Sequence, residues 1–499
     1  MEPIIIDGGP LTPQQVVAVA LDRVPVTTGP QLAARMAPAR DLVDRAVETG
    51  ETIYGITTGF GALATTRIGR DDSETLQYNL IRSHATGVGD PIPDTLVRAM
   101  LLLRARTLAQ GHSGVRPVVV EKLLDMLNRN ILPLIPGQGS VGASGDLAPF
   151  AHMALPLIGE GYVRAGDQVL PTSDTDLVPL ELKTKEGLAL LNGTEGMSAM
   201  GVLALSQARI LVEAADVACS LSVEALMGSS RPFRPEVHDL RPHPGQVSSA
   251  ARIAALISGS EIGSSHAGDF EHAVQDAYSL RCAPQVHGAV SDTLDHMEAV
   301  LIRELGSVVD NPIVFPASNE VISGGNFHGQ PLAFVLDFAG IAVAELGSIS
   351  ERRTDRILDP ARSGGLPAFL AANPGLDSGY MITQYVQAAL VAENKVLVHP
   401  ASVESIPTSG SQEDHVSMGW GAGKKLFPIL DNVRRVLAIE IICAVQGVEC
   451  RRPLLPGPGT ARVMGLVRDV VPTLSEDRSP SAEIEAVARM IADGQIRAT

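Results

Sequence analysis

The strongest constraint on how this chain can fold comes from long stretches in which apolar residues recur with helical spacing. Ala and Leu are frequent in them, and the longest, Met197–Leu226 and Gly421–Gln446, exceed the usual upper length of a globular helix, about 20 residues. Such lengths predict a mainly α protein built as a bundle of long helices rather than around a sheet. The other stretches of this kind are Thr95–Leu108, Val118–Asn128, Thr293–Leu305, Leu332–Arg352 and Gln384–Leu397.

Shorter elements are predicted in the N-terminal part of the chain. Ile4–Ile6 is typical of a short strand. Thr12 followed by Pro13 supplies the N-cap and the first-turn proline of a helix through Val16–Asp22. The apolar runs within Tyr162–Leu170 indicate a small hairpin that turns at a Gly-Asp pair.

Length and composition are those of a globular protein with ample material for a core. The chain has 499 residues, of which 45% are hydrophobic and 19% charged. We expect a motif-rich N-terminal domain over residues 1–200, and the long-helix bundle with the C-terminal region over residues 201–499. The formal net charge of −17 leaves no surplus of basic residues for phosphate, so nucleic acid is not an expected partner.

The sequence predicts a cytoplasmic protein without membrane contact. The four cysteines show no C-x-x-C spacing, which argues against a disulfide framework and a zinc site. Met1–Asp7 lacks the basic and apolar parts of a signal peptide. No apolar run reaches the roughly 18 residues of a membrane span, and the candidate Leu332–Val343 is interrupted by Asp337.

The run Gly139–Pro149 contains Ala143-Ser144-Gly145, a tripeptide that can build an electrophile from its own backbone. Attack of the Gly145 amide nitrogen on the Ala143 carbonyl would close a five-membered ring. Loss of water there, and of a second water from Ser144, would leave 4-methylidene-imidazol-5-one. A small residue at 143 leaves room for closure, and Gly145 has no Cβ to shield its nitrogen. Because ordinary side chains are not electrophiles, the tripeptide would supply what otherwise requires an external cofactor.

Other interpretations of these residues fit less well. Gly137–Gly142 matches the G-x-G-x-x-G pattern of a dinucleotide-binding turn, but the two prolines of Ile131–Pro136 argue against the strand that should precede it. Ser144 is not a hydrolase nucleophile of the G-x-S-x-G type, because Asp146 stands where the second Gly belongs. No metal site is predicted either, since the candidate histidine pairs do not share the i, i+4 helical spacing. These pairs are His238 with His243 and His266 with His272.

Several blocks of the sequence resemble the aromatic amino acid lyase family, which includes histidine, tyrosine and phenylalanine ammonia-lyases. The resemblance implies an aspartase/fumarase-like lyase fold, in which a smaller N-terminal region carries the prosthetic-group loop beside the long-helix bundle. It also implies a homotetramer whose active sites draw on several chains, so that the tripeptide and Gln275–Arg281 of one site come from different subunits. The blocks are Tyr54–Gly61, Gly139–Gly161, Leu191–Thr194, Gln275–Val286, Gly324–Gly329 and Gln412–Met418.

By this resemblance the reaction removes ammonia from a small-molecule α-amino acid. The substrate amine adds to the methylidene carbon formed from Ser144 and becomes a better leaving group, and a base takes the Cβ proton. The resemblance implies that Tyr54 is this base, with its ordinary pKa of about 10 lowered locally. It implies that Asn192 hydrogen-bonds the prosthetic ring. Asp146 is expected to orient the backbone for cyclisation.

A second group of residues is expected to hold the substrate. Arg281 suits a carboxylate because a guanidinium can make two parallel hydrogen bonds to it. Tyr278 lies three residues earlier and would share a helical face with Arg281. The resemblance implies that both residues and Gln275 line the site, with Tyr278 among the catalytic residues, and that Phe327 packs beside the substrate and the prosthetic group.

Two positions favour histidine as the substrate, which would give trans-urocanate. Ser83-His84 resembles the histidine enzymes of the family, whereas the tyrosine and phenylalanine enzymes tend to carry His-Leu or Phe-Leu. Glu413 also favours histidine, because the tyrosine and phenylalanine enzymes have Asn-Gln-Asp-Val or a similar sequence in this block. An imidazole offers one donor and one acceptor, so a carboxylate and a second imidazole can address both ring nitrogens.

Some residues depart from the pattern of the histidine enzymes and leave alternatives open. Thr58 and Gln330 resemble tyrosine aminomutases, which return ammonia to Cβ, and Ser411 stands where many histidine lyases have Asn. A tyrosine or phenylalanine ammonia-lyase, a tyrosine 2,3-aminomutase and a catalytically inactive structural homologue therefore remain alternative hypotheses. Glu413 favours histidine among them.

Overall fold

The chain was analysed as a computed structural model, and its contacts divide it into two compact units. Residues 2–59, 63, 66–69, 72–266 and 274–498 are described by the structure. Unit 1 comprises Met1–Leu203, Glu298–Leu336 and Pro400–Lys424. Unit 2 comprises Ala204–Met297, Asp337–His399 and Lys425–Thr499. Both units combine segments that are far apart in the sequence, and the predicted division at residue 200 stays a prediction.

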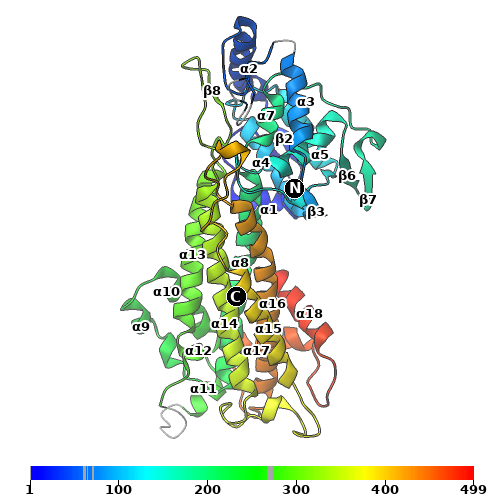
Figure 1. The fold of residues 1–499 in the computed structure, drawn as a ribbon. Helices are drawn as coiled ribbons and strands as arrows, with labels where there is room; N and C mark the ends of the chain where they lie inside the picture. The colour runs from blue at the N-terminus through cyan, green and yellow to red at the C-terminus, as the bar shows by residue number, and fades with distance from the viewer. Residues whose placement is uncertain (1, 60–62, 64–65, 70–71, 267–273, 499) are drawn as a thin grey trace. The chain divides into compact units, whose positions relative to one another are not determined.

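Helices dominate both units (Figure 1). The α-helices are α1 (Pro13–Ala20), α2 (Leu32–Thr49), α3 (Ser73–His84), α4 (Asp94–Leu108), α5 (Pro117–Asn128), α6 (Leu147–Ala154), α7 (Glu186–Leu191), α8 (Glu195–Ala225), α9 (Pro235–Asp239), α10 (Pro244–Leu256), α11 (Glu261–Ser265), α12 (Tyr278–Arg281), α13 (Ala283–Glu304), α14 (Gln330–Leu358), α15 (Met381–Leu397), α16 (Gly419–Glu449), α17 (Pro458–Arg468) and α18 (Ser481–Ala492). The 3₁₀ turns are η3 (Leu155–Ile158), η4 (Thr172–Asp174), η5 (Arg231–Phe233), η6 (Ala368–Leu370) and η7 (Ser409–Ser411).

The predicted mainly α architecture is confirmed, including the long helices. Helices α8 and α16 each have 31 residues and α14 has 29. The predicted cap of α1 is also present, because the Thr12 side chain accepts a hydrogen bond from the Gln15 backbone, and the Gln15 side chain accepts one from the Thr12 backbone. Helix α2 was not predicted, although it runs for 18 residues and contains Pro38.

The strands form small sheets that connect helices rather than a core sheet. They are β1 (Ile4–Ile6), β2 (Val26–Thr28), β3 (Val88–Pro91), β4 (Ile131–Pro133), β5 (Pro136–Gln138), β6 (Tyr162–Ala165), β7 (Gln168–Pro171), β8 (Ile313–Phe315) and β9 (Glu320–Ile322). The strand orders are β1-β2, which is parallel, and the antiparallel β3-β5, β4-β6-β7 and β8-β9. The predicted strand at Ile4–Ile6 and the hairpin turning after Ala165 are therefore confirmed.

The expectation that prolines exclude strands around residues 131–136 was wrong. Pro133 is the last residue of β4 and Pro136 the first residue of β5. Proline is tolerated at such terminal positions because the missing N–H interrupts little of the ladder. These strands have three residues each and belong to sheets of two or three strands, so they do not form the parallel sheet that a dinucleotide-binding turn requires.

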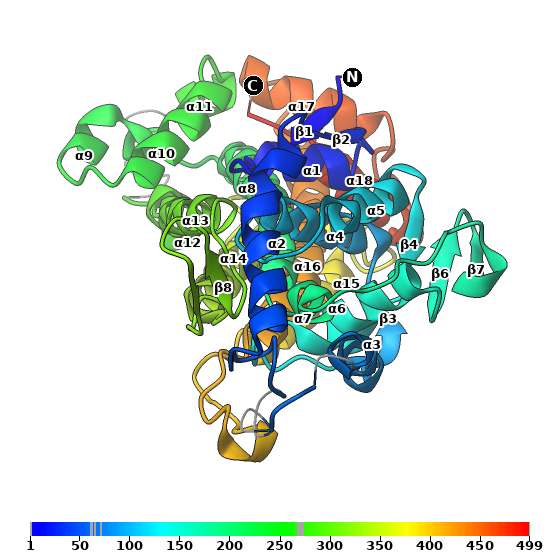
Figure 2. The same ribbon diagram turned by 90° about the horizontal axis from the view of Figure 1, so that it is seen from above.

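The helices of unit 2 form a bundle, in which α15 and the unit 2 parts of α8, α13, α14 and α16 run in roughly the same direction (Figures 1 and 2). Glycines allow close approach between these helices. A Cβ on Gly340 of α14 would lie 3.3 Å from Ile429 of α16, and a Cβ on Gly447 of α16 would lie 2.9 Å from Ala225 of α8. Small residues at these crossings let the backbones pack closely.

Helix α14 corrects one expectation about membrane spans. By length and composition it could cross a membrane, and its best 18-residue window has a mean hydropathy of 1.8. Asp337 does not prevent this, contrary to the sequence argument. Within the fold 56% of that window is buried, and Asp337 forms an ion pair of 2.7 Å with Lys425 of α16. More than half of this apolar window is thus used for packing within the fold.

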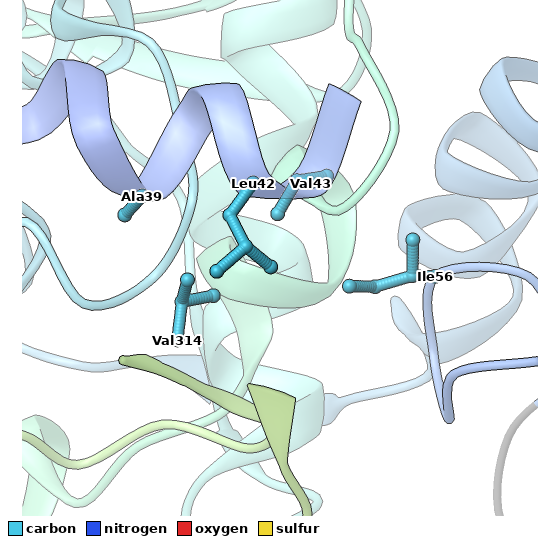
Figure 3. Packing of buried hydrophobic residues seen from close by; sticks show 5 residues of the cluster. All are labelled: Ala39, Leu42, Val43, Ile56 and Val314. Carbon is cyan, nitrogen blue, oxygen red and sulfur yellow. The ribbon is translucent and has the colours of Figure 1, made fainter. Parts of the chain in front are cut away.

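A small hydrophobic cluster in unit 1 supports the turn that carries Tyr54. Leu42 and Val43 of α2 pack with Ile56, which lies two residues after Tyr54, and with Val314 of β8 (Figure 3). Ala39 completes the cluster, whose members are at most 6% exposed. Packing of Ile56 against α2 therefore fixes the chain next to Tyr54.

Candidate active site

The tripeptide lies in a loop of unit 1 between β5 and α6, in an unusual backbone conformation. Ser144 has a φ of 51° and Gly145 a φ of 79°, so two successive residues are left-handed. This conformation is unfavourable for serine and costs about 1 kcal/mol or more. A Cβ on Gly145 would overlap the carbonyl oxygen of Gly193. The structure thus adds a second reason for glycine at 145, beyond the exposure of its nitrogen.

Backbone hydrogen bonds connect the loop to Gly193, in the segment that follows α7. Gly145 and Gly193 form an isolated parallel bridge. The Asp146 N–H donates to the Gly193 carbonyl at 3.0 Å, and the Gly193 N–H donates to the Ser144 carbonyl at 3.3 Å. These hydrogen bonds flank the amide nitrogen of Gly145, the atom that would close the ring.

Asp146 fastens the other side of the loop to the start of α8. Its carboxylate accepts hydrogen bonds from the Ser140 hydroxyl and from the Met197 N–H, both at 3.0 Å. The side chain is fully buried, and burial raises the pKa of Asp146 to about 7, although the two hydrogen bonds oppose this shift. Asp146 thereby links the loop to the first turn of α8.

A cavity of about 530 Å³ in unit 1 opens onto Ser144. Five of the predicted site residues line it: Tyr54, His84, Ser144, Asn192 and Glu413. The rest of the lining is largely apolar, and apart from Ser83 none of it was predicted as a site residue. It includes Leu63, Ile68, Leu76, Leu80, Leu147, Leu188 and Leu191, together with Gly59, Thr66, Asn79, Ser83 and Ser409.

His84 and Glu413 are brought together in this cavity. His84 is the last residue of α3, and burial lowers its pKa, partly opposed by a hydrogen bond with the Leu80 carbonyl and by the charge of Glu413. The Glu413 carboxylate accepts a hydrogen bond of 2.8 Å from the Thr408 hydroxyl. The arrangement offers a neutral imidazole and a carboxylate to the same ligand.

Asn192 ends α7 and is fixed by several hydrogen bonds. Its side-chain amide donates to the carbonyl of Asn311 at 3.2 Å, and its own carbonyl accepts from the guanidinium of Arg104. Asn311 is positioned in turn by Asp310, which forms a fully buried ion pair of 2.8 Å with Lys185. The orientation of Asn192 thus depends on two buried cations.

Tyr54 lies in the turn between α2 and α3, and Thr58 closes that turn. The Thr58 hydroxyl accepts from the Gly55 N–H at 3.2 Å and donates to the Gly59 carbonyl at 3.0 Å. Thr58 is buried and is not part of the cavity lining. This local role accounts for a threonine at the position. The final residues of the sequence block, Phe60 and Gly61, lie outside the described residues.

The remaining predicted residues do not line the cavity. Gln275, Tyr278 and Arg281 belong to unit 2, and Phe327 lies in unit 1 in the segment between β9 and α14. The Arg281 guanidinium lies 4.4 Å from the centre of the Tyr278 ring, which confirms that the two side chains share a face of α12. Tyr278 is 72% exposed.

Comparison with known proteins decides the family. A sequence profile described as "Aromatic amino acid lyase" matches residues 11–469. The chain belongs to this family. Histidine ammonia-lyase of Gloeobacter violaceus is 50% identical over 497 residues, which cover 99% of this chain and 96% of that protein. This member of the aromatic amino acid lyase family is accordingly a carbon–nitrogen lyase in class.

Solved structures of two enzymes resemble the chain closely. Histidine ammonia-lyase from Trypanosoma cruzi is 42% identical, has a TM-score of 0.91, and the match covers 99% of this chain and 94% of that one. Tyrosine aminomutase from Streptomyces globisporus is 40% identical with a TM-score of 0.94, covering 99% and 98%. The backbone fold is thus common to both activities and does not distinguish them.

Sequence reasoning missed two charged residues behind the loop, Arg104 and Glu195. Arg104 lies within helix α4 and is fully buried, and its guanidinium contacts Glu195 at 3.2 Å. Arg104 directly follows the apolar run Ala99–Leu103, and a charge next to such a run is a signal that could have identified it.

No metal site is found among the described residues. No three His, Cys, Asp or Glu side chains among them form a group that could hold a metal, and His272 lies outside the described residues.

Proposed function

We propose that this chain is a histidine ammonia-lyase, which eliminates ammonia from L-histidine and releases trans-urocanate. The observation that carries the proposal is that His84 and Glu413 line the same cavity as Ser144. Groups suited to an imidazole are therefore available beside the tripeptide. The 50% identity to a histidine ammonia-lyase over nearly the whole chain supports the same substrate.

We also propose that Ala143-Ser144-Gly145 becomes 4-methylidene-imidazol-5-one, with no external cofactor. The loop fits this group, because residues 144 and 145 are left-handed, a side chain at 145 is excluded by Gly193, and Asp146 is held at both carboxylate oxygens. Once formed, the group supplies an electrophilic alkene for the substrate amine. Asn192, fixed behind the loop, would hydrogen-bond the ring.

The chain's own side chains would then hold the substrate and move its protons. The His84 imidazole can donate a hydrogen bond to the acceptor nitrogen of the substrate ring, while the Glu413 carboxylate accepts one from the ring N–H on the other side. Tyr54 lines the same cavity and would take the proton from the substrate Cβ. The leucines of the lining give the cavity an apolar wall around this step.

The substrate carboxylate points to a contribution from another copy of the chain. The described lining of the cavity contains no Arg or Lys, although a carboxylate in such a cavity requires a cation. Arg281, with Tyr278 and Gln275, would provide this contact from a neighbouring subunit of a homotetramer, and Phe327 would pack beside the substrate in the assembled site. We expect the assembly to be cytoplasmic.

A tyrosine aminomutase is the main alternative, because a structure of that activity matches the fold as well as a histidine ammonia-lyase does. Gln330, which resembles the aminomutases, lies at the start of α14 and does not line the cavity. Thr58 likewise has a local structural role. The two residues that favoured the aminomutase therefore do not form part of the substrate cavity in this chain.

The experiment supplies L-histidine, L-tyrosine and L-phenylalanine separately to the purified protein. Unsaturated acids are followed by ultraviolet absorbance, ammonia by a coupled assay, and β-amino acids by chromatography. We expect urocanate and ammonia from histidine alone. A β-amino acid from tyrosine, or cinnamate-type products, would contradict histidine as the substrate while retaining the electrophile.

The variant Glu413→Gln tests the basis of this specificity. We expect kcat/KM for histidine to fall about 10- to 100-fold, because a hydrogen bond to a charged group is worth about 1.5–3 kcal/mol. Glu404→Gln is a matched control, since Glu404 is an exposed acid in the same segment. Equal rates for Glu413→Gln and the wild type would show that the substrate ring does not contact Glu413.

A further inference from the structure

The backbone of Asn192 and Gly193 forms a wall directly behind the tripeptide. On one side Gly193 is hydrogen-bonded to Ser144 and Asp146. On the other side there is no space, because a Cβ on Gly193 would overlap both the Glu195 carboxylate and the Arg104 guanidinium. Gly193 is therefore enclosed between the tripeptide and a buried ion pair.

Arg104 connects this ion pair to the wall. One guanidinium nitrogen, Nη1, donates both to the Asn192 carbonyl and to Glu195 Oε2, the latter at 3.2 Å. The guanidinium carbon lies 5.8 Å from the centre of the Phe150 ring, on the helix that follows the tripeptide. Arg104 therefore contacts both the Asn192–Gly193 segment and helix α6, which follows the tripeptide.

The ion pair is incomplete as a stabilising interaction. Arg104 Nε and Nη2 are buried and find no hydrogen-bond partner among the described residues. Leaving donors of a buried cation unpaired costs free energy, about 1–3 kcal/mol for each group. An arginine used only for stability would gain by pairing these atoms. The side chain is instead arranged so that Nη1 lies at the Asn192 carbonyl, at the expense of the other two nitrogens.

We propose that Arg104 is a positioning residue for ring closure in the tripeptide. Together with Glu195 it fixes the Asn192 carbonyl, and through Gly193 it holds Ser144 and Gly145 in the left-handed conformation from which the Gly145 nitrogen reaches the Ala143 carbonyl. This inference rests on the proposed prosthetic group. It concerns the formation of that group rather than turnover of the substrate.

The closure that Arg104 assists balances without an oxidant or reductant. A bond forms between the Gly145 nitrogen and the Ala143 carbonyl carbon, and the Gly145 amide proton moves to the carbonyl oxygen. That oxygen leaves as water with the amide proton of Ser144. The Ser144 Cα proton and the Ser144 hydroxyl then leave together as a second water, which creates the exocyclic double bond. The finished chain is lighter than its translated sequence by two water molecules.

The test measures the intact mass of folded, purified protein, sampled at intervals after a pulse of expression. The variants are Arg104→Met, which removes the donor, and Arg104→Lys, which keeps the charge but replaces the rigid, planar guanidinium by a compact ammonium on a flexible chain, so that the donor is no longer held at the position of Nη1. The control is Arg353→Met in unit 2, because Arg353 and Glu440 form an equally buried Arg–Glu pair. Circular dichroism and gel filtration establish that each sampled protein is folded.

We expect the wild type and Arg353→Met to lose two waters at the same rate. Ring formation in Arg104→Met should be about 10²-fold slower, which is the scale of a misplacement of about 1 Å, and Arg104→Lys should be intermediate. If Arg104→Met does not fold, the folded Arg104→Lys variant decides the outcome by its rate.

Each other outcome has a definite meaning. Ring formation at the wild-type rate in the folded Arg104 variants would overturn the role of Arg104. Equal slowing in Arg353→Met would also overturn it, because the slowing would then come from the general loss of stability and not from displacement of the Asn192–Gly193 backbone. A wild type that keeps its full translated mass would instead refute the proposed prosthetic group, so the two failures can be distinguished.

Discussion

The two units contain buried Arg–Glu pairs that differ in completeness. In unit 2, Arg353 binds Glu440 through two parallel hydrogen bonds, from Nε at 2.5 Å and from Nη2 at 2.9 Å. Its remaining nitrogen, Nη1, donates to the Ser279 carbonyl at 3.3 Å, and Ser222 donates to Glu440 at 2.6 Å. In unit 1, Arg104 places a single nitrogen on its acceptors and leaves two others unpaired.

A second buried acid extends the network of unit 2. Asp216 is fully buried and accepts hydrogen bonds from Arg252 and His287, both at 2.7 Å. The other ring nitrogen of His287 lies 3.5 Å from Arg353. The network therefore joins α8, α10, α13, α14 and α16 within the unit.

The difference indicates what each pair does. A complete buried network orders the helices around it, because every donor and acceptor constrains a neighbour. An incomplete pair beside a loop with two left-handed residues destabilises the folded chain, and such costs are retained mainly at functional sites. The pair of unit 2 is thus built for packing, and the pair of unit 1 fits the proposed role of holding the backbone of the tripeptide.

The largest expected effect separates chemistry from packing. Ser144→Ala removes the hydroxyl that would leave as the second water in the proposed ring formation, so the exocyclic double bond could not form. We expect activity to fall on the order of 10⁴-fold or more, as when a catalytic nucleophile is removed, while both buried pairs and the urea midpoint are retained. Activity assays, intact mass and urea unfolding check this. Substantial activity in the variant would show that the reaction does not require the Ser144 hydroxyl of unit 1.

The next effect concerns the complete pair of unit 2. Glu440→Gln leaves the Arg353 charge buried without a counter-charge, and we expect the free energy of unfolding to fall by about 3–5 kcal/mol. Urea unfolding measures it. The chain should still become lighter by two waters, because the tripeptide belongs to unit 1. A stability loss below about 1 kcal/mol would show that this pair does not order the bundle.

Periodicity and local chemistry identified much of this molecule from its sequence. Apolar spacing predicted α8, α14 and α16 because long amphipathic helices leave a repeated pattern. The tripeptide pointed to its loop because the chemistry predicted for it depends only on adjacent residues. Helix α2 escaped notice because Pro38 lies inside it, where a proline usually ends a helix.

Features that depend on distant residues could not be predicted in this way. Arg104 and Asn192 are separated by 88 positions, and nothing local pairs them. The cavity brings together residues from 54 to 413, so its apolar lining follows only from the folded chain. His84 and Glu413 were selected through family resemblance, and the structure shows that they share one cavity.

The smallest expected effect is an opposite response of the two units to pH. Burial raises the pKa of Glu195 to about 7 from its ordinary 4.5, with Arg104 lowering it and Glu304 raising it. The folded state therefore binds a proton that the unfolded state has released, and this contribution to stability is lost as pH rises from about 4.5 to about 7. Burial lowers the pKa of His287, despite the opposing influence of Asp216, so its contribution is lost as pH falls below about 6.5.

Urea unfolding between pH 4.5 and pH 8 measures both responses through the neutral variants Glu195→Gln and His287→Gln. The stability of the wild type relative to Glu195→Gln should decrease with rising pH, by on the order of 1 kcal/mol across the window. Its stability relative to His287→Gln should instead increase with pH up to about 6.5. If both differences changed in the same direction, Glu195 would be ionised throughout like an ordinary paired acid. The contrast between an incomplete and a complete pair would then have no electrostatic consequence.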